Sequence, residues 1–201
     1  VSHSASTLLE AFLGLLIGCA VGFVVAVLMD RFEAVGLALD PLVTLSQTIP
    51  TVAIAPLLVL WFGYGLAPKV VLVIISTFFP ITVSLVSGFR SADADMIDLM
   101  RTMNAGDWQI FWQVKIPAAA EQFFGGLRIS ATYAIVGAVI AEWLGGFSGL
   151  GVYMTRVRKS FSYDRMFAVI LLISALSLAL MGIVDVLRRV AMPWKRAERK
   201  R

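Results

Sequence analysis

The chain has 201 residues, of which 59% are hydrophobic and only 15% are charged. A soluble domain of this size would be near half apolar and a quarter charged, so this composition excludes an ordinary soluble protein and indicates a lipid environment. The net charge is +4, but seven of the seventeen Lys and Arg residues follow Leu187. Their clustering predicts a basic cytoplasmic tail at 188–201 rather than a nucleic-acid site.

Five apolar stretches follow one another along the chain. Each has roughly 18 to 22 residues, close to the ~20 that a transmembrane helix needs. We therefore predict an all-α fold, a polytopic bundle of five membrane-spanning helices that forms one domain over residues 1–201. The predicted spans are approximately 8–29, 42–62, 70–89, 127–144 and 166–187.

The first stretch carries three glycines, Gly14, Gly18 and Gly22, which recur every four residues and share one helix face. This small-xxx-small pattern predicts close packing against another helix. Glu10 interrupts the same stretch, and we expect it to lie near the membrane interface rather than at mid-membrane.

Prolines interrupt the second and third stretches at Pro50, Pro56 and Pro80. Each proline removes a backbone hydrogen bond that lipid cannot replace, so these helices must pack against neighbours or line a watery path. The prolines are candidates either for static kinks or for gating of a translocation path. Glu142 closes the fourth stretch, where an ionisable group is a functional candidate or, at the interface, merely solvated.

The segment 90–117 is too polar to cross a membrane and too regular for a loose loop. Asp93 and Asp95 can cap a short helix. We expect that helix to stop at residues 104–106, because Asn and Gly accept the left-handed backbone conformation that ends helices. A second short helix is predicted to begin at Asp107 and to end at Pro117.

Three aromatic residues of the second short helix, Trp108, Phe111 and Trp112, fall at helical spacing. In one interpretation they are apolar anchors that dock into a groove of a partner protein. In the other, the tryptophans dip into the bilayer interface, where Trp is common. Arg101 follows Asp98 by three residues, so an intrahelical ion pair is its simplest role.

Counting spans back from the basic tail predicts the orientation of the chain. With the tail in the cytoplasm, the segment 90–117 and the turn at 30–40 also lie inside. The turn at 63–69, the loop at 145–165 and Val1 then lie outside. Because the chain begins outside without a Met or a signal peptide, we expect one more transmembrane helix upstream in the complete protein.

The polar segment resembles the cytoplasmic coupling loop of bacterial ABC importer permeases, through DLMRTMNAG at 98–106 and KIPAA at 115–119. Asn104 stands where glycine is usual in that family, and it keeps the capacity for a left-handed backbone. The resemblance implies that this segment couples the chain to an ATPase. The implied coupling residues are Asp98, Leu99, Met100, Arg101, Asn104, Gly106, Trp108, Phe111, Trp112 and Pro117.

The resemblance covers almost the whole chain, from Leu8 to Leu187. The stretches TIPTVAIAPLLVLWFGYGLAPKV, IAEWLGGFSGLGVYM and SYDRMFAVI resemble the nitrate–sulfonate–taurine branch of these permeases. Within that branch, WFGYGLAPKV and EWLGG are most similar to permeases for the pyrimidine precursor of thiamine. An alkanesulfonate, taurine or nitrate permease of the same branch is the alternative.

This resemblance implies a type I importer permease fold, multi-pass in the bacterial inner membrane, with no enzymatic activity of its own. The implied partners are a second copy in a homodimer, cytosolic ATPase subunits and an extracytoplasmic substrate-binding protein. The chain lacks a GxxxxGK[ST] phosphate loop, so we expect ATP and Mg²⁺ to bind the partner ATPase and no cofactor to bind here. No metal site is expected, since His3 has no Cys or acidic partner at ligand spacing.

An ion-coupled secondary transporter is the rival from another class. Such proteins usually need buried carboxylates or histidines for ion coupling. The acidic residues within or at the ends of the predicted spans are Glu10, Glu142 and Asp185, none near a span's centre. Their positions count against this rival.

Overall fold

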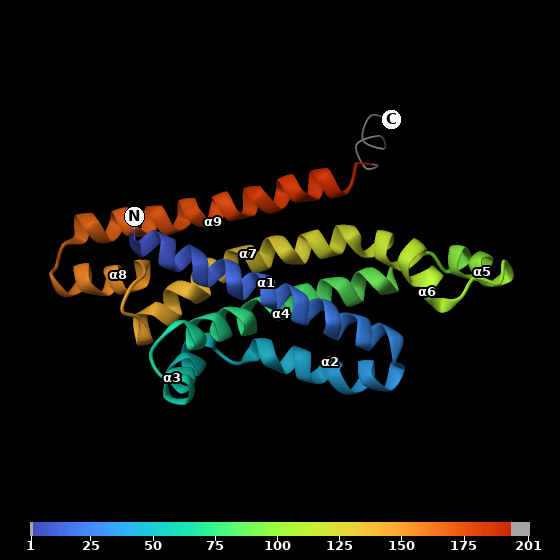
Figure 1. The fold of residues 1–201 in the computed structure, drawn as a ribbon, viewed down its shortest axis with the longest axis horizontal. Helices are drawn as coiled ribbons and strands as arrows, with labels where there is room; N and C mark the ends of the chain where they lie inside the picture. The colour runs from blue at the N-terminus through green and yellow to red at the C-terminus, as the bar shows by residue number, and fades with distance from the viewer. Residues whose placement is uncertain (1, 194–201) are drawn as a thin grey trace.

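The computed structural model describes residues 2–193, and every regular element in that range is a helix (Figure 1). The absence of strands among the described residues confirms the predicted all-α class. The helices are α1 (Ser2–Arg31), α2 (Glu33–Thr48), α3 (Thr51–Phe62), α4 (Leu66–Arg90), α5 (Ala94–Thr102), α6 (Asp107–Ile110), the π-helical turn η1 (Phe111–Lys115), α7 (Ile116–Gly145), α8 (Leu150–Lys159) and α9 (Tyr163–Ala191).

The long helices form an elongated bundle around α4, which packs most extensively against α7 and α1. Helix α9 lies along one side of the bundle, and α2 and α3 lie on the opposite side (Figure 1). Most of α9 is exposed, as expected of an apolar helix that faces lipid.

Four helical runs are long and apolar enough to cross a membrane: α1, α4, the continuous run Asp107–Leu144 and α9. Helices α2 and α3 together form a fifth candidate, but they are bent by 96° at a break. The five apolar segments are therefore confirmed, whereas the prediction that the second is one continuous helix is wrong. The break falls where Ile49 adopts an extended conformation (φ −80°, ψ 120°), which is the conformation that a following proline favours.

Pro50, the residue after the break, caps α3 at its start, and Pro56 and Pro80 lie inside α3 and α4. Helix α2 contains a further proline, Pro41, which the sequence analysis did not single out. The three proline candidates therefore occupy two different settings, one at a break and two within helices.

Two segments differ from the sequence prediction at the end of the bundle that carries the N-terminus. The predicted turn at 63–69 is shorter, because α4 begins at Leu66 and takes Lys69 into its first turns. The predicted loop at 145–165 contains α8, whose Leu150 and Val157 are buried while its basic residues are exposed. Helix α8 is too short and too polar to cross a membrane.

The connecting segments lie at the two ends of the bundle in the arrangement that counting the spans predicts. The α1–α2 turn, α5, α6 and the C-terminal end of α9 lie at one end, on the right of Figure 1. The N-terminus, the α3–α4 turn and α8 lie at the other. Of the predicted tail 188–201, residues 188–191 still belong to α9, and residues 194–201 lie outside the described residues.

The predicted close packing of the first span is confirmed, and its partner is α4. Gly14, Gly18 and Gly22 face Val73, Thr77 and Ile81 of α4 in turn. A Cβ atom at Gly22 would lie 2.9 Å from the carbonyl oxygen of Phe78, so the two backbones approach each other closely. This contact packs α1 tightly against the central helix α4.

Candidate functional site

The predicted coupling segment forms an elbow of two helices, α5 and α6, which projects from the end of the bundle (Figure 1). Asp93 caps α5 by accepting a hydrogen bond from the backbone N–H of Asp95 at 2.9 Å, as predicted. The helix ends at Asn104, whose φ of 61° is left-handed. Gly106 does not share that conformation, because its φ is −72° and it caps the start of α6. The stop therefore depends on Asn104 alone.

The sequence predicted a separate short helix for the second half of the elbow, and this prediction is wrong. Helix α6 continues through η1 into α7, so Pro117 lies at the start of α7 instead of ending a helix. In η1 the N–H of Ile116 bonds to the carbonyl of Phe111, five residues back. This π turn directly precedes Pro117, which lies in the first turn of α7 and has no N–H to donate.

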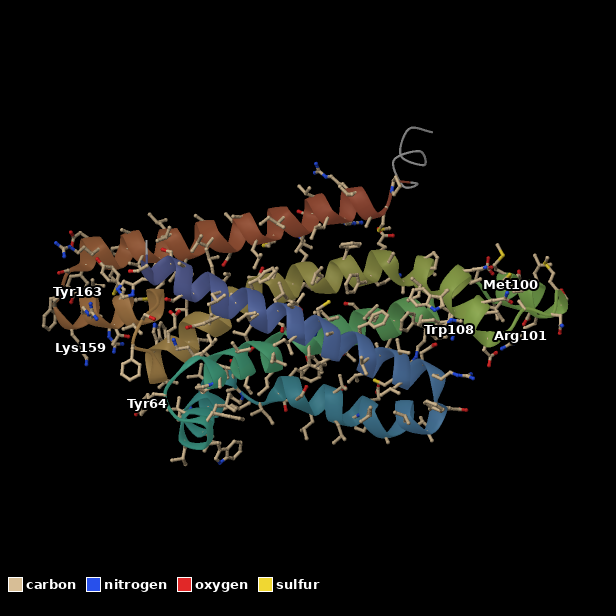
Figure 2. All side chains as sticks on the ribbon, in the orientation of Figure 1. Tyr64, Met100, Arg101, Trp108, Lys159 and Tyr163 are labelled. Atoms are coloured by element: carbon tan, nitrogen blue, oxygen red, sulfur yellow. The ribbon has the colours of Figure 1, made fainter. Side chains whose placement is uncertain are left out.

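The aromatic residues of the elbow divide into an outward and an inward set. Trp108 is 69% exposed and Trp112 is 49% exposed. Phe111 instead packs inward, with its ring centroid 5.4 Å from that of Phe89 in α4. Figure 2 shows Trp108 at the elbow, together with Met100 and Arg101 of α5. The exposed surface of the elbow is therefore formed by the tryptophans and by α5.

Helix α5 buries none of its residues within the described chain. Its apolar residues Met96 and Leu99 and the adjacent Met103 are largely exposed. The predicted pair between Asp98 and Arg101 is present at 3.4 Å, and both side chains are exposed. An exposed pair of this kind contributes little to stability. Because none of its residues is buried, α5 is a projecting helix that presents apolar side chains.

A cavity of about 550 Å³ lies beside the break between α2 and α3. Two of the four predicted pathway residues, Pro50 and Pro80, line it, whereas Pro56 and Glu142 do not. All of its lining side chains are uncharged. They are Ser46, Gln47, Ile49, Pro50, Thr51, Ile75, Ser76, Phe79, Pro80, Val83, Ser84, Ile129, Tyr133, Val136, Gly137 and Ile140.

Several polar groups of this cavity are available to a solute. Ser46 and Ser76 donate to carbonyls of their own helices, at 2.6 and 2.9 Å. Four other polar side chains of the lining make no side-chain hydrogen bond with any described residue. They are Gln47, Thr51, Ser84 and Tyr133. Together with Phe79 and the aliphatic residues, they form an apolar chamber with a few free donors and acceptors, which is typical of small-molecule sites.

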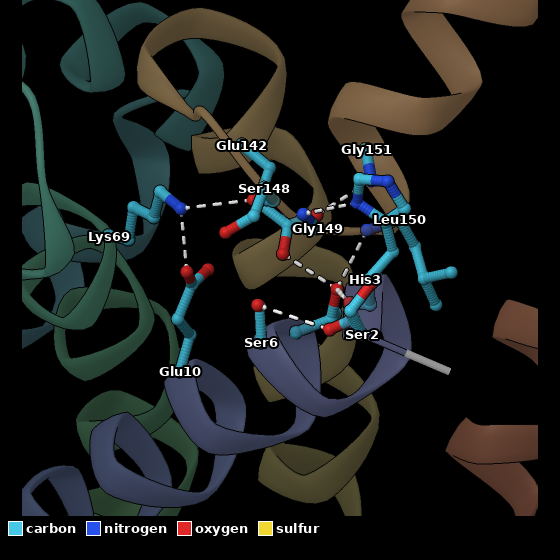
Figure 3. Close-up of polar contacts among 11 residues, drawn as sticks. Ser2, His3, Ser6, Glu10, Lys69, Glu142, Ser148, Gly149, Leu150 and Gly151 are labelled. Carbon is cyan, nitrogen blue, oxygen red and sulfur yellow. Dashed lines mark hydrogen bonds and ion pairs between the residues drawn. The ribbon is translucent and has the colours of Figure 1, made fainter.

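Glu142 lies elsewhere, in a buried polar cluster near the N-terminus (Figure 3). Thr7 of α1 donates to its Oε1 atom at 2.6 Å, and the backbone N–H of Gly151 donates to its Oε2 atom at 2.6 Å. Both carboxylate oxygens thus accept hydrogen bonds from protein donors. Glu142 therefore neither lines the cavity nor lies in solvent at the interface. Its position joins α1, α7 and the start of α8.

The same cluster contains an ion pair that the sequence did not indicate. Lys69 Nζ lies 2.6 Å from Glu10 Oε1, and the two side chains are only 6% and 4% exposed. Lys69 also donates to the carbonyl of Ser148 at 3.3 Å. Glu10 is therefore buried within the protein, and its expected depth near the membrane interface stays a prediction. A buried charge requires a partner, and Lys69 supplies it.

Residues 14–191 match the model of the family described as binding-protein-dependent transport system inner membrane component. The chain belongs to this family, and it is the permease subunit of an ABC importer. This result confirms the predicted family and the multi-pass location in the bacterial cytoplasmic membrane. Members work with an ATPase and an extracytoplasmic binding protein.

Two curated relatives show what the chain is similar to. A probable ABC transporter permease of Haemophilus influenzae is 40% identical over 183 residues, which are 91% of this chain and 75% of that protein. The formylaminopyrimidine transport permease ThiX of Halalkalibacterium halodurans is 36% identical over 197 residues, 98% of this chain and 79% of that protein. The predicted resemblance to pyrimidine permeases is confirmed.

A solved structure of the methionine ABC transporter MetNI, in an inward-facing conformation, has the same fold. Its TM-score is 0.77 at 19% identity, and the match covers 92% of each chain. This likeness confirms the predicted type I importer permease fold.

Proposed function

We propose that the cavity at the α2–α3 break is part of the translocation path, and that the solute is a small uncharged nitrogen heterocycle such as formylaminopyrimidine. The proposal rests on one observation above all, which is that every described side chain lining this cavity is uncharged. The similarity to a formylaminopyrimidine permease supports it. We further propose that two copies of the chain form a homodimer around the path.

The free polar groups of the cavity suit a heterocycle. Gln47, Thr51 and Tyr133 can donate to ring nitrogens or accept from amino groups. Pro80 has no N–H, so the carbonyl of Ser76 lacks its α-helical donor and can accept from a solute. Phe79 and Tyr133 offer aromatic surfaces against which a planar ring can stack.

A sulfonate, taurine or nitrate path of the same branch is the alternative, and one feature favours it. Helix α3 begins at Thr51 beside the cavity, and the N-terminus of a helix attracts anions. That attraction is typically worth only about 0.3–1 kcal/mol, whereas removing a full charge from water costs far more without a paired cation. The uncharged solute therefore fits the lining better.

Uptake into proteoliposomes tests the solute directly. With its ATPase and binding protein, the chain is expected to accumulate labelled formylaminopyrimidine, and unlabelled taurine is not expected to compete. Thr51→Val removes one hydrogen bond and should weaken the apparent affinity by roughly threefold to tenfold. Ser174→Ala, on the lipid-facing α9 and away from the cavity, is the matched control. Uptake of taurine without uptake of the pyrimidine would reject the proposed solute.

We also propose that the elbow docks onto the ATPase subunit, which binds and hydrolyses ATP for the complex. The chain itself has no phosphate loop. The supporting observation is that the elbow leaves Leu99, Met103 and Trp108 largely exposed at the end of the bundle. Isolated helices with exposed apolar anchors fit grooves in partner proteins.

Removing the outward tryptophans tests the docking. Trp108→Ala with Trp112→Ala is expected to weaken association with the ATPase, since each anchor contributes on the order of 1–3 kcal/mol if it is buried on docking. Because Phe111 packs inward, it is kept. Phe147→Ala, an 80% exposed aromatic residue at the opposite end, is the control and should assemble normally. Co-purification of the ATPase is the measurement. Normal assembly of the double variant would assign the tryptophans to the bilayer interface.

A further inference from the structure

Two ion pairs connect the end of α1 to the elbow. Lys115 Nζ donates to both Oδ1 and Oδ2 of Asp30 at 2.8 Å, and the two side chains are only 25% and 13% exposed. Arg31 Nη1 lies 2.8 Å from Asp107 Oδ2, but these side chains are 61% and 65% exposed. Asp30 lies in the last turn of α1, and Lys115 closes η1. The Asp30–Lys115 pair is thus the better shielded of the two links.

Little else holds α1 to the outer part of the elbow. A cavity of about 560 Å³ separates them, and its lining includes Asp30, Arg31, Asp98, Arg101 and Trp108. A force applied to α5 can reach the bundle through the short connection to α4 at residues 91–93 and through α6 and η1, and the second of these routes passes Lys115. The ion pair lies at that point of transfer, where Lys115 also ends the π turn.

The other ends of the same two helical runs are also joined. Helices α6 and α7 form one continuous run, Asp107–Leu144, which extends from the elbow to Glu142. There Thr7 of α1 donates to Glu142 at 2.6 Å. Helix α1 is therefore fastened to this run by Asp30–Lys115 at one end and by Thr7–Glu142 at the other, while α4 lies packed against both.

We propose that Asp30 and Lys115 are positioning residues for transport, whose ion pair makes α1 move together with the elbow. The α1 helix and the α6–α7 run then act as one lever between the ATPase and the far end of the bundle. This inference rests on the proposed docking of the elbow to an ATPase. Without the pair, the neighbouring cavity leaves the elbow room to move while α1 stays in place.

The physical basis is the difference in exposure between the two links. A well-exposed ion pair contributes little because water screens it and competes for both partners. A shielded, bidentate pair resists separation, since opening it leaves a charge in a poorly solvated place. Breaking Asp30–Lys115 should therefore release the elbow, whereas breaking Arg31–Asp107 should not.

A distance measurement on the complex with the ATPase, in nanodiscs, tests this without any solute. Spin labels are placed at Phe32 and Thr102 in a Cys19→Ser background, and the labelled chain is diluted with unlabelled chain. The label separation is expected to be the same without nucleotide and after trapping with ADP and vanadate. In Lys115→Met it should change on trapping, and in Arg31→Gln it should not. An unchanged separation in Lys115→Met, or a changed one in the wild type, overturns the inference.

A charge exchange separates positioning from a merely structural role. Lys115→Met should keep its ATPase subunit and its basal hydrolysis, while stimulation by loaded binding protein falls to nearly onefold. Asp30→Lys combined with Lys115→Asp should restore most of the stimulation. Parallel loss of assembly and basal hydrolysis, or a failure of the exchange to rescue, contradicts the proposal. A wild-type chain that binds no ATPase overturns the docking and this inference together.

Discussion

Gly22→Leu is expected to destabilise the folded chain severely, because α1 and α4 touch at this point through their backbones. A Cβ atom there would lie 2.9 Å from the carbonyl oxygen of Phe78 and 3.1 Å from Cγ2 of Ile81. The carbonyl belongs to a helix and cannot turn away, so the helices must separate along the Gly14–Gly18–Gly22 face. Overpacking of a core typically costs about 1–3 kcal/mol, and a backbone obstacle places this site at the upper end. The measurement is the thermal unfolding temperature in detergent.

The matched control is Gly182→Leu. Gly182 lies in the apolar helix α9, and nothing lies within 4 Å of a Cβ atom built there. The same side chain is added to a membrane helix of the same protein, so insertion and helix propensity change in the same way. Equal unfolding temperatures for the two variants would show that α1 does not approach α4 as closely as the structure places it.

The features that could be predicted from the sequence are those encoded within a few neighbouring residues. Membrane spans require an unbroken apolar run, and helix packing through small residues requires a four-residue spacing. The start of α5 follows from Asp93, whose side chain accepts from the adjacent backbone, and its stop follows from Asn104, which adopts a left-handed backbone conformation. Each of these signals is local, so each feature could be predicted from the sequence.

The break between α2 and α3 could be predicted from the sequence only in part. Pro50 marks the place, but a proline is compatible with a kink inside one helix or with two separate helices. The outcome depends on which neighbours satisfy the freed backbone groups, and that is a tertiary property. The cavity at the break therefore could not be predicted, although Pro50 and Pro80 both pointed to it.

The polar links of the bundle were missed for a different reason. Lys69 and Glu10 are 59 residues apart in the chain, and Lys115 and Asp30 are 85 apart. No spacing rule relates such pairs, and Lys69 falls in a predicted turn, where a charged residue needs no partner. Their signal lay only in the general rule that a charge inside a membrane protein is paired.

Lys69→Met is expected to destabilise the chain strongly, because it leaves Glu10 buried without its cation. The pair is 2.6 Å apart and almost fully shielded, and the Oε2 atom of Glu10 has no donor within the described chain. Removing one partner of a buried pair typically costs about 3–5 kcal/mol, since the remaining charge loses its solvation and its partner together. The measurement is again thermal unfolding in detergent. Arg101→Met, which breaks the exposed pair with Asp98, is the control and should change the unfolding temperature little.

Combining Lys69→Met with Glu10→Gln distinguishes the loss of a charge partner from the loss of packing. Both charges are then absent, and a neutral amide replaces the orphaned carboxylate at nearly the same volume. If the cost of Lys69→Met is electrostatic, the double variant should be more stable than Lys69→Met alone. If the Lys69 side chain matters for its packing or for its bond to the carbonyl of Ser148, the second substitution adds its own loss instead. Glu142 keeps its donors from Thr7 and Gly151 in every variant, but it also interacts with both Glu10 and Lys69, so the comparison reports on the charge balance of the whole buried cluster.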